Sequence, residues 1–396
     1  MATIVKKFGG TSLATLPKIQ AAAKRILSEQ KPGDHTVVVT SAMAGVTDQL
    51  AQMAFQLSPE NTAETDTVLT TGEQISAALF ALALQRMGTK SRSWLAWQLP
   101  IETTPNGGRA NITHINLTDL RAFMNEGGIS VVAGFQGLAS TGRLTTLGRG
   151  GSDITALALA AAFTQEPESP QPANCTIYTD VKGVFTADPH IVKGALKVDT
   201  ISHACIKRLG QAGAAVLHPT SLLFASRANL SFTIAHHEHT SPGTTVTPNT
   251  NKTAHPFFIA AQPGWVRCVI KTSPGRALGL FLKDIAHTDK VCALSDRLFY
   301  IEGSTYRQNQ DMLHDMEPQL GTAHGFDAIT LLAEPGTDLS SISRQIEQTC
   351  GPQDAYTNTE NQATFFAPSD LSAAIQNKIH NTLYQQTPSS LSKHYA

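Results

Sequence analysis

The stretch "LTTLGRGGSD", residues 144–153, places glycines, an arginine and an aspartate directly before "ITALALAAAF", an alanine-rich run that predicts a helix. Glycine-rich turns free backbone N–H groups, and the start of a helix favours negative charge. Arg149 adds a permanent cation whose fork of donors matches a carboxylate. We therefore expect an anion to bind here. A plain turn in which Ser152 or Asp153 caps the helix is the alternative, and it leaves Arg149 unexplained.

A second glycine-rich turn, "KFGGTS", covers Lys7–Ser12 and follows the first expected strand. Paired glycines let successive N–H groups face one point, which suits phosphate oxygens, and Lys7 adds a mobile positive charge. The spacing fits neither a Walker A loop nor GxGxxG. Glycines at such turns are also common without a ligand, so this turn alone leaves both interpretations open.

Other polar residues stand where strands end or helices begin. Ser41 and Thr47 lie in "TSAMAGVTD", residues 40–48, where they can bind a ligand or cap a helix. Glu73 opens an expected helix, where a carboxylate is favoured by the helix dipole and can also receive an ammonium group. Asp180 follows an expected buried strand. The tract "HHEH", residues 236–239, is a weak candidate for a metal site.

The first 245 residues alternate short apolar runs with helical patterns, which predicts a mostly parallel sheet covered by helices on both faces. One helix is expected over "TTGEQISAALFALALQRMG", with a capping box formed by Thr71 and Gln74. The apolar residues Ile75, Ala78, Leu79 and Leu82 share one face of it. Ligands of open α/β sheets bind at the carboxyl ends of the strands, so the clusters are expected to converge on one crevice.

The pattern changes after residue 245. Residues 239–256 are rich in Pro, Thr and Asn and predict a linker. Beyond them, two similar runs of strands and helices predict two small ferredoxin-like α+β modules. The predicted boundaries are therefore 1–246 for the α/β domain, 247–325 and 326–388 for the two modules, and 389–396 for a disordered tail.

Composition limits the function. Thirty basic and 31 acidic residues leave a net charge of −1, which argues against nucleic acid as the main partner. The five cysteines are scattered and show no CxxC spacing, so neither a disulfide framework nor a zinc site is predicted. We find no signal peptide and no stretch near 20 apolar residues. The sequence predicts a soluble cytoplasmic protein with no membrane partner.

Seven motifs occur in the order found in aspartate kinases of the amino-acid-kinase superfamily, and residues 3 to about 246 resemble the catalytic domain of that family. The tandem modules behind them resemble its regulatory ACT domains. The fold implied is the amino-acid-kinase fold followed by two ACT-type modules. The motifs are "VKKFGGTS", "SAMAGVTD", "TTGEQ", "GFQG", "TTLGRGGSD", "YTDVKGVFTADP" and "GAAVLHP".

The resemblance implies transfer of the ATP γ-phosphoryl group to the side-chain carboxylate of L-aspartate, giving 4-phospho-L-aspartate, with ATP and Mg²⁺ required. It makes Lys7 the lysine that stabilises the transferring group and Asp153 the residue that holds Lys7. Glu73 would receive the α-ammonium group and Arg149 a carboxylate. The expected aspartate contacts are Ser41, Thr47, Glu73, Arg149, Gly150, Gly151 and Ser152, and the expected ATP contacts are Lys7, Phe8, Gly9, Gly10, Thr179, Asp180, Phe185 and His190.

The sequence departs from the family mainly on the nucleotide side. Ala215 stands where the family has a lysine before "VLHP", and His190 replaces the arginine of "DPR". Phe185 replaces a common tyrosine, and Gln74 a common arginine. Two alternatives therefore stand beside an aspartate kinase. One is a kinase for a related amino acid, and the other is an amino-acid sensor that lost turnover with the lysine at position 215.

The resemblance also implies a place in metabolism and an assembly. The family serves lysine and threonine biosynthesis, and feedback inhibition by one of these amino acids is expected. A homodimer through the ACT-like modules is the default assembly, because their strands leave sheet edges that pair readily.

Overall fold

The computed structural model describes residues 2–58, 63–166, 171–214, 216–249, 257–270, 291–295, 298–309, 320–333, 354–359 and 361–384, with residues 313, 339, 342 and 346. The chain forms two compact units. The first holds Met1–Val184, Lys197–Lys207 and Ala215–Asn251, and the second holds Phe185–Leu196, Arg208–Ala214 and Lys252–Ala396. The chain therefore crosses between the units several times.

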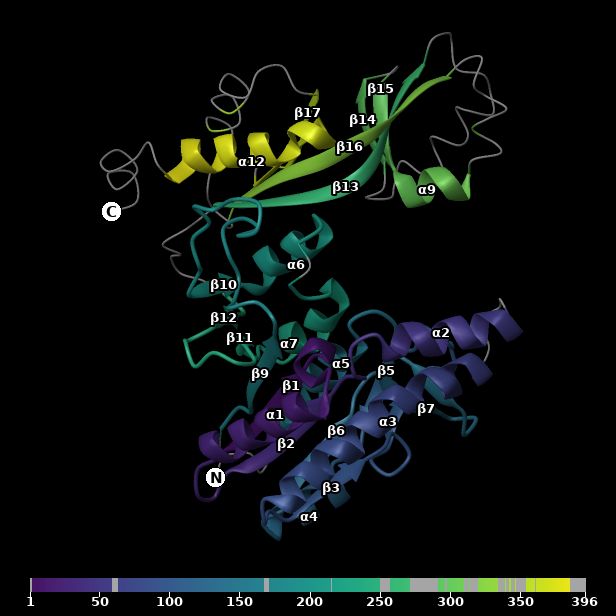
Figure 1. Ribbon diagram of the computed structural model, residues 1–396, viewed down its shortest axis with the longest axis vertical. Coiled ribbons are helices and arrows are strands. Elements are labelled where there is room, and N and C mark those ends of the chain that lie inside the picture. The colour runs from purple at the N-terminus through teal and green to yellow at the C-terminus, as the bar shows by residue number, and fades with distance from the viewer. Residues whose placement is uncertain are drawn as a thin grey trace. The chain divides into compact units, whose positions relative to one another are not determined.

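The first unit is built on an eight-stranded sheet (Figure 1). All neighbouring strands in it are parallel except β11 and β12, which confirms the predicted, mostly parallel α/β sheet. In spatial order the strands are β10 (Thr200–Ser202), β12 (Thr244–Thr247), β11 (Phe232–His236), β9 (Asn174–Thr179), β1 (Thr3–Phe8), β2 (His35–Thr40), β6 (Ile129–Ala133) and β3 (Ser91–Trp94).

Helices cover both faces of this sheet. Helices α1 (Leu16–Glu29) and α3 (Ala63–Arg86) contact each other and pack over one face around Phe8 and Phe80. Helix α5 (Gly151–Gln165) lies against β1, β2 and β9. Successive side chains of a strand point to opposite faces. Accordingly, Lys6 pairs with Glu29 of α1, and Lys7 pairs with Asp153 of α5.

The remaining elements of the first unit form a second, four-stranded sheet and shorter helices. That sheet has the order β5 (Ile112–Ile115), β4 (Ile101–Thr103), β7 (Gln136–Ala139), β8 (Leu144–Thr146). Strand β8 also contacts α3. The other helices are η1 (Gly10–Leu13), α2 (Val46–Leu57), α4 (Thr118–Asn125), α6 (His203–Gln211), which continues into the second unit, η2 (Pro219–Ser221) and α7 (Leu222–Arg227).

The predicted capping box of α3 is wrong. The helix begins at Ala63 rather than near Thr71, so Thr71 caps nothing and its hydroxyl donates to the Val68 carbonyl at 2.6 Å. On the face that the apolar residues share, Ile75 and Leu82 are exposed, at 53% and 59%. The buried face of the helix mixes small, apolar and polar residues. It comprises Asp66, Thr70, Gly72, Glu73, Ser76, Ala77, Phe80, Ala81 and Leu84.

Helix α3 is also long and apolar enough, by length and composition alone, to cross a membrane. Among the described residues it is the one helix that passes this test, which the sequence reasoning did not anticipate. Its contacts with α1, α2, β3, β6 and β8 are those of a core helix.

The predicted linker is wrong in one part. Residues 244–247 form β12, which pairs antiparallel with β11 and parallel with β10. The run "TTVT" is β-branched and suits a strand, whereas the surrounding Pro and Asn residues concealed it.

The second unit is built on one antiparallel six-stranded sheet (Figure 1). Its two central strands are 14 residues long and join the strands of both predicted modules. Trp265, Tyr300 and Phe366 stack on the sheet. In order the strands are β14 (Val291–Ser295), β15 (Leu298–Glu302), β13 (Phe257–Ile270), β16 (Leu320–Ala333), β18 (Gln362–Pro368) and β17 (Asp354–Thr359).

Helices α9 (Gly303–Gln308) and α12 (Ser369–Tyr384) complete the described part of this unit. The segment Phe185–Leu196 packs here: Val192 joins the core around Ile259 and Ile379, and Thr186 Oγ1 lies 3.0 Å from His380 Nε2. The sequence also predicts helices over 273–287 and 337–350. The first of these, most of the second and the predicted tail at 389–396 lie outside the described residues.

Candidate active site

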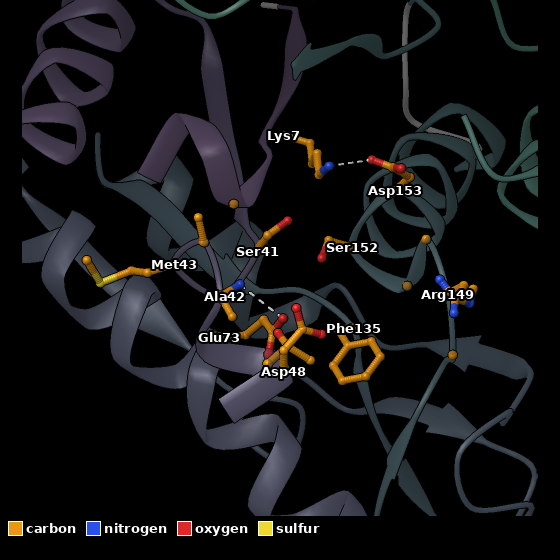
Figure 2. A pocket seen from close by; sticks show the side chains of 17 residues that line it. Lys7, Ser41, Ala42, Met43, Asp48, Glu73, Phe135, Arg149, Ser152 and Asp153 are labelled. Atoms are coloured by element: carbon orange, nitrogen blue, oxygen red, sulfur yellow. Dashed lines mark hydrogen bonds and ion pairs between the residues drawn. The ribbon is translucent and has the colours of Figure 1, made fainter. Parts of the chain in front are cut away.

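One cavity of about 350 Å³ in the first unit gathers the residues that the sequence singled out (Figure 2). It lies at the carboxyl ends of β1, β2 and β6, where the turns after these strands meet α3 and the start of α5. Both predicted catalytic residues and all seven predicted aspartate contacts line it. The lining is Lys7, Gly10, Ser41, Ala42, Met43, Ala44, Gly45, Thr47, Asp48, Glu73, Phe135, Gly148, Arg149, Gly150, Gly151, Ser152 and Asp153.

Lys7 and Asp153 form a buried ion pair in this cavity. Lys7 Nζ lies 2.6 Å from Asp153 Oδ1, and the two side chains are 11% and 14% exposed. The inward side of β1 presents Lys7, and the first turn of α5 presents Asp153. A carboxylate beside a buried ammonium attracts it and holds it in one place. The pair therefore fixes one positive charge at the cavity wall (Figure 2).

The turn into α5 depends on glycine. Gly148 and Gly150 have φ of +74° and +71°, the left-handed region that side chains disfavour. A Cβ on Gly150 would lie 2.5 Å from His218 Cβ. Gly150 is the N-cap residue and no side chain caps the helix, so capping by Ser152 or Asp153 is wrong. Both residues lie inside the first turn and face the cavity.

Arg149 stands between these two glycines with its donors free. Within the described part of the chain, its guanidinium makes no hydrogen bond or ion pair. Burial, and next the positive charge of Arg149, lowers the pKa of His218. The Gly151 amide donates a hydrogen bond to the Gly148 carbonyl at 3.0 Å. It is therefore occupied and is not a free hydrogen-bond donor to an anion. The guanidinium therefore supplies the main anion contact of this turn.

Glu73 is buried at 3% exposure with half of its carboxylate unsatisfied. Oε1 accepts the Ala42 amide at 3.0 Å, whereas Oε2 has no hydrogen-bond partner among the described residues. Burial raises the pKa of Glu73 to about 7. An unpaired buried carboxylate is costly, and a cation placed beside it removes that cost. Oε2 is therefore a receptor for a positively charged group.

The sequence reasoning did not select Phe135, Asp48 and Met43, which also line the cavity. Phe135 has φ of +69°, an uncommon conformation for a bulky residue. Its N–H donates to Thr155 Oγ1 at 3.1 Å, and its carbonyl accepts the Leu147 amide at 2.9 Å. In Figure 2, Phe135 and Asp48 lie beside Glu73. The motifs "GFQG" and "SAMAGVTD" contain Phe135 and Asp48 and were the signals available.

Several predicted ATP contacts lie away from this cavity. Phe8 is fully buried between Phe80 and Tyr178, so its ring reaches no ligand. The Gly9 amide donates to the Tyr178 carbonyl at 3.2 Å and is therefore occupied, so the contact of Gly9 with ATP stays a prediction. Gly10 does line the cavity and begins η1, where a helical turn leaves amides unpaired.

The other nucleotide-side residues are scattered between the two units. Thr179 and Asp180 follow β9 at the same sheet edge, and the Thr179 hydroxyl donates to Asp180 Oδ1 at 3.1 Å. Phe185 and His190 belong to the second unit, where the His190 amide donates to Asp188 Oδ1 at 2.8 Å. Ala215 lies outside the described residues.

The histidine tract does not gather as metal ligands. His236 Nδ1 accepts the Glu238 amide at 2.9 Å, and His237 Nδ1 lies 2.9 Å from the Thr179 carbonyl. In the part of the chain that the structure describes, no three His, Cys, Asp or Glu side chains are placed to hold a metal ion. These contacts give the tract a structural role at the end of β11.

Sequence comparison relates the chain to known proteins. The model of the amino acid kinase family matches residues 2–236. The aspartokinase of Geobacillus stearothermophilus is 43% identical over 256 residues, which are 64% of this chain and 61% of that protein. The chain thus aligns with about three fifths of the length of this relative.

Structural comparison extends over nearly the whole chain. Escherichia coli aspartokinase III in complex with aspartate and ADP (R-state) matches with a TM-score of 0.75 and 22% identity, over 96% of this chain and all of that one. The same enzyme in complex with lysine and aspartate (T-state) matches with a TM-score of 0.75 and 21% identity, over 96% and 99%. At these identities the likeness establishes the fold, including the sheet of the second unit.

Proposed function

Because the chain belongs to the amino acid kinase family, we propose that it is an aspartate kinase, which transfers the γ-phosphoryl group of ATP to the side-chain carboxylate of L-aspartate. The observation that carries this proposal is the single cavity that joins the Lys7–Asp153 pair to Glu73 and Arg149. The name of the Geobacillus relative supports the same activity.

An α-amino acid satisfies the two unpaired charges of this cavity. Its ammonium group neutralises Glu73 Oε2, which is buried without a partner. A carboxylate of the acceptor forms two hydrogen bonds with the Arg149 guanidinium. The hydroxyls of Ser41, Thr47 and Ser152 surround the remainder of the acceptor molecule. Two charged contacts fix the orientation of the acceptor, so its second carboxylate points to one place.

Lys7 stands where charge develops during transfer. Phosphoryl transfer is catalysed mainly by positioning and by neutralising charge on the equatorial oxygens. The ion pair with Asp153 holds the Lys7 ammonium at the cavity wall. The product is an acyl phosphate, 4-phospho-L-aspartate, with ADP as the leaving group.

ATP binds at the adjoining edge in this proposal. Gly10 and Lys7 contact its phosphates, and Thr179 and Asp180 lie at the end of the neighbouring strand. Mg²⁺ accompanies ATP and neutralises phosphate charge when it is bound. The described residues provide no three-ligand cage, which fits an ion that is held mostly by substrate phosphates and water.

Ala215 favours a second candidate function. An amino-acid sensor retains the acceptor site but lacks the lysine expected near the nucleotide. The buried Lys7–Asp153 pair argues against it, because a protein that only binds the acceptor has no need of that pair. A kinase for a related amino acid is the other alternative, and a panel of acceptors separates it from an aspartate kinase.

We also propose a regulated, cytoplasmic homodimer. The second unit supplies the regulatory ACT-like modules, with boundaries near residues 247–325 and 326–388. Strands β14 and β17 stand at the two ends of its sheet order, and the proposed pairing with a second copy of the chain takes place at these strands. Lysine or threonine is the expected effector, and the E. coli enzyme, whose fold this chain shares, was solved with lysine.

The test is a hydroxylamine-trapped assay with Mg-ATP and L-aspartate. An acyl phosphate reacts with hydroxylamine to give a coloured hydroxamate, so a kinase yields a saturable signal. Lys7→Met is the control that removes the proposed phosphoryl contact. Hydroxamate from the wild type but not from this variant supports the proposal. Calorimetric binding of aspartate with no hydroxamate at high enzyme concentration supports the sensor instead.

A further inference from the structure

Asp66 is a buried carboxylate that the proposed chemistry does not use. It lies on α3 with no exposed surface, and it accepts four hydrogen bonds. The Gly108 amide lies 3.1 Å and 3.0 Å from its two oxygens. The Thr146 amide lies 3.0 Å from Oδ2, and the Thr146 hydroxyl lies 2.8 Å from Oδ1. The backbone and hydroxyl donors thus satisfy both oxygens of this buried carboxyl group.

These contacts hold the strand that leads to Arg149. Thr146 ends β8, and Arg149 follows three residues later. The second partner, Gly108, approaches the same turn: a Cβ on Gly148 would lie 3.1 Å from the Gly108 carbonyl oxygen. The Ala110 amide donates to the Thr146 carbonyl at 2.9 Å, which ties the two segments together. Asp66 therefore anchors both chain segments that support the Arg149 turn.

Glu73, which receives the ammonium group in the proposed function, lies on the same face of α3 as Asp66. Glu73 comes seven residues after Asp66, which is two helical turns or about 10 Å along the axis. Glu73 binds the Ala42 amide, and the Ser76 hydroxyl donates to the Ser41 carbonyl at 2.6 Å. One rigid helix thus holds the Arg149 turn at one point and the Ser41–Ala42 turn at another.

We propose that Asp66 is a positioning residue that sets the spacing between Arg149 and Glu73, and so selects the length of the amino acid that the cavity accepts. This inference rests on the proposed function, which assigns the acceptor to these two residues. The helix fixes the distance between its two anchoring points, Asp66 and Glu73, because its rise per residue does not change when a ligand binds. Releasing Asp66 lets the Arg149 turn move while Glu73 and Lys7 stay in place.

The decisive variant is Asp66→Asn, which keeps the shape but replaces an acceptor oxygen by an amide that faces N–H donors. We expect the KM for L-aspartate to rise at least tenfold while the KM for ATP changes less than twofold. A displacement of about 1 Å at such a contact costs up to 10²-fold. L-Glutamate is one methylene longer than L-aspartate. We also expect the ratio of kcat/KM for L-aspartate to kcat/KM for L-glutamate to fall at least fivefold.

Two further variants separate positioning from folding. Thr146→Val removes one of the four hydrogen bonds, and we expect it to raise the KM for aspartate about threefold. Ser91→Ala is the matched control, because the buried Ser91 hydroxyl also ties a strand to α3, by donating to the Ala81 carbonyl at 2.9 Å, far from Arg149. It should lower the melting temperature and leave both KM values unchanged.

The outcomes are distinct. An unchanged aspartate KM and unchanged acceptor preference in Asp66→Asn overturn the proposal, as does an equal change in both KM values. If that variant does not fold, Thr146→Val decides in the same way. If the wild type shows no turnover, calorimetric affinity for L-aspartate replaces KM, so the role of Asp66 is tested although the kinase assignment has failed. A wild type that neither turns over nor binds aspartate overturns both.

Discussion

The two halves of the proposed site are held in different ways. On the acceptor side, Glu73, the Ser41–Ala42 turn and the Arg149 turn are tied through α3 by several buried hydrogen bonds. On the nucleotide side, Gly10 and one buried pair, Lys7–Asp153, belong to the cavity, and the other expected contacts lie outside its lining. The departures from the family fall mostly on this second side. A residue with several buried hydrogen-bond partners tolerates few substitutions, because each substitution disturbs all of its partners. A residue that makes one isolated contact can be substituted without disturbing others.

The largest effect is expected from Lys7→Met, which tests the one fixed contact of the nucleotide side. Loss of a preorganised charge beside the transferring group costs about 10²–10³-fold in kcat. The variant also leaves the Asp153 carboxylate buried without its cation, so its melting temperature should fall. Hydroxamate formation and thermal unfolding measure the two effects. A kcat within threefold of the wild type would place the phosphoryl group elsewhere.

On the acceptor side, Arg149→Lys keeps the charge and removes the planar fork. We expect the KM for aspartate to rise about 30-fold with little change in the KM for ATP, because lysine cannot bind a carboxylate in bidentate fashion. Arg143→Lys is the matched control, since Arg143 pairs with Glu64 at the exposed surface. Equal effects of the two substitutions would remove Arg149 from the acceptor site.

Glu73 gives the acceptor side a pH dependence. Its pKa is raised by burial to about 7, so the carboxylate is mostly protonated below pH 7 and mostly charged above it. Only the charged form receives an ammonium group. The value of kcat/KM for aspartate should therefore rise about tenfold between pH 6 and pH 8. Glu73→Gln should remove this rise.

The same shift has a consequence for stability. The folded protein binds its proton more tightly than the unfolded chain, so this group costs stability as pH rises from about 4.5 to 7. Glu73→Gln should therefore stabilise the protein above pH 7, on the order of 2 kcal/mol, and have little effect near pH 4.5. Thermal unfolding of both proteins at the two pH values checks the sign.

The smallest effect is expected from Ala215→Lys, which restores the family's residue on the nucleotide side. We expect a three- to tenfold gain in kcat/KM for ATP, below the full value of a cationic contact, because the rest of the site has diverged. The acceptor KM should not change. A silent wild type with an active variant would identify the natural protein as a weakened kinase.

The sequence was sufficient for the parallel sheet and for the convergence of the acceptor residues. Strand ends are marked by β-branched runs followed by glycine, as at Lys7–Gly10, and the carboxyl ends of parallel strands meet at one edge. Composition could not reveal which face of α3 is buried, because that face carries Asp66 and Glu73 and not an apolar stripe. Their partners are backbone groups distant in sequence, which no local pattern encodes.

The Gly9 amide is likewise occupied by a contact with a segment distant in sequence, so it is not a free hydrogen-bond donor. A glycine pair predicts free amides, yet the Gly9 amide completes the pairing of β1 with β9 through the Tyr178 carbonyl. Strand β12 was hidden for the opposite reason, since its β-branched run is short and lies among turn residues. In each case a contact between distant segments decides what the local sequence leaves open.

The central claim is that Glu73 and Arg149 hold the two ends of an α-amino acid in one cavity. Calorimetric titration with L-aspartate and with succinate, which lacks only the ammonium group, tests it most directly in the wild type and in Glu73→Gln at pH 8. We predict that the wild type prefers aspartate at least tenfold and that the variant binds the two ligands within twofold of each other. Equal affinity in the wild type, or an undiminished preference in the variant, would contradict the account.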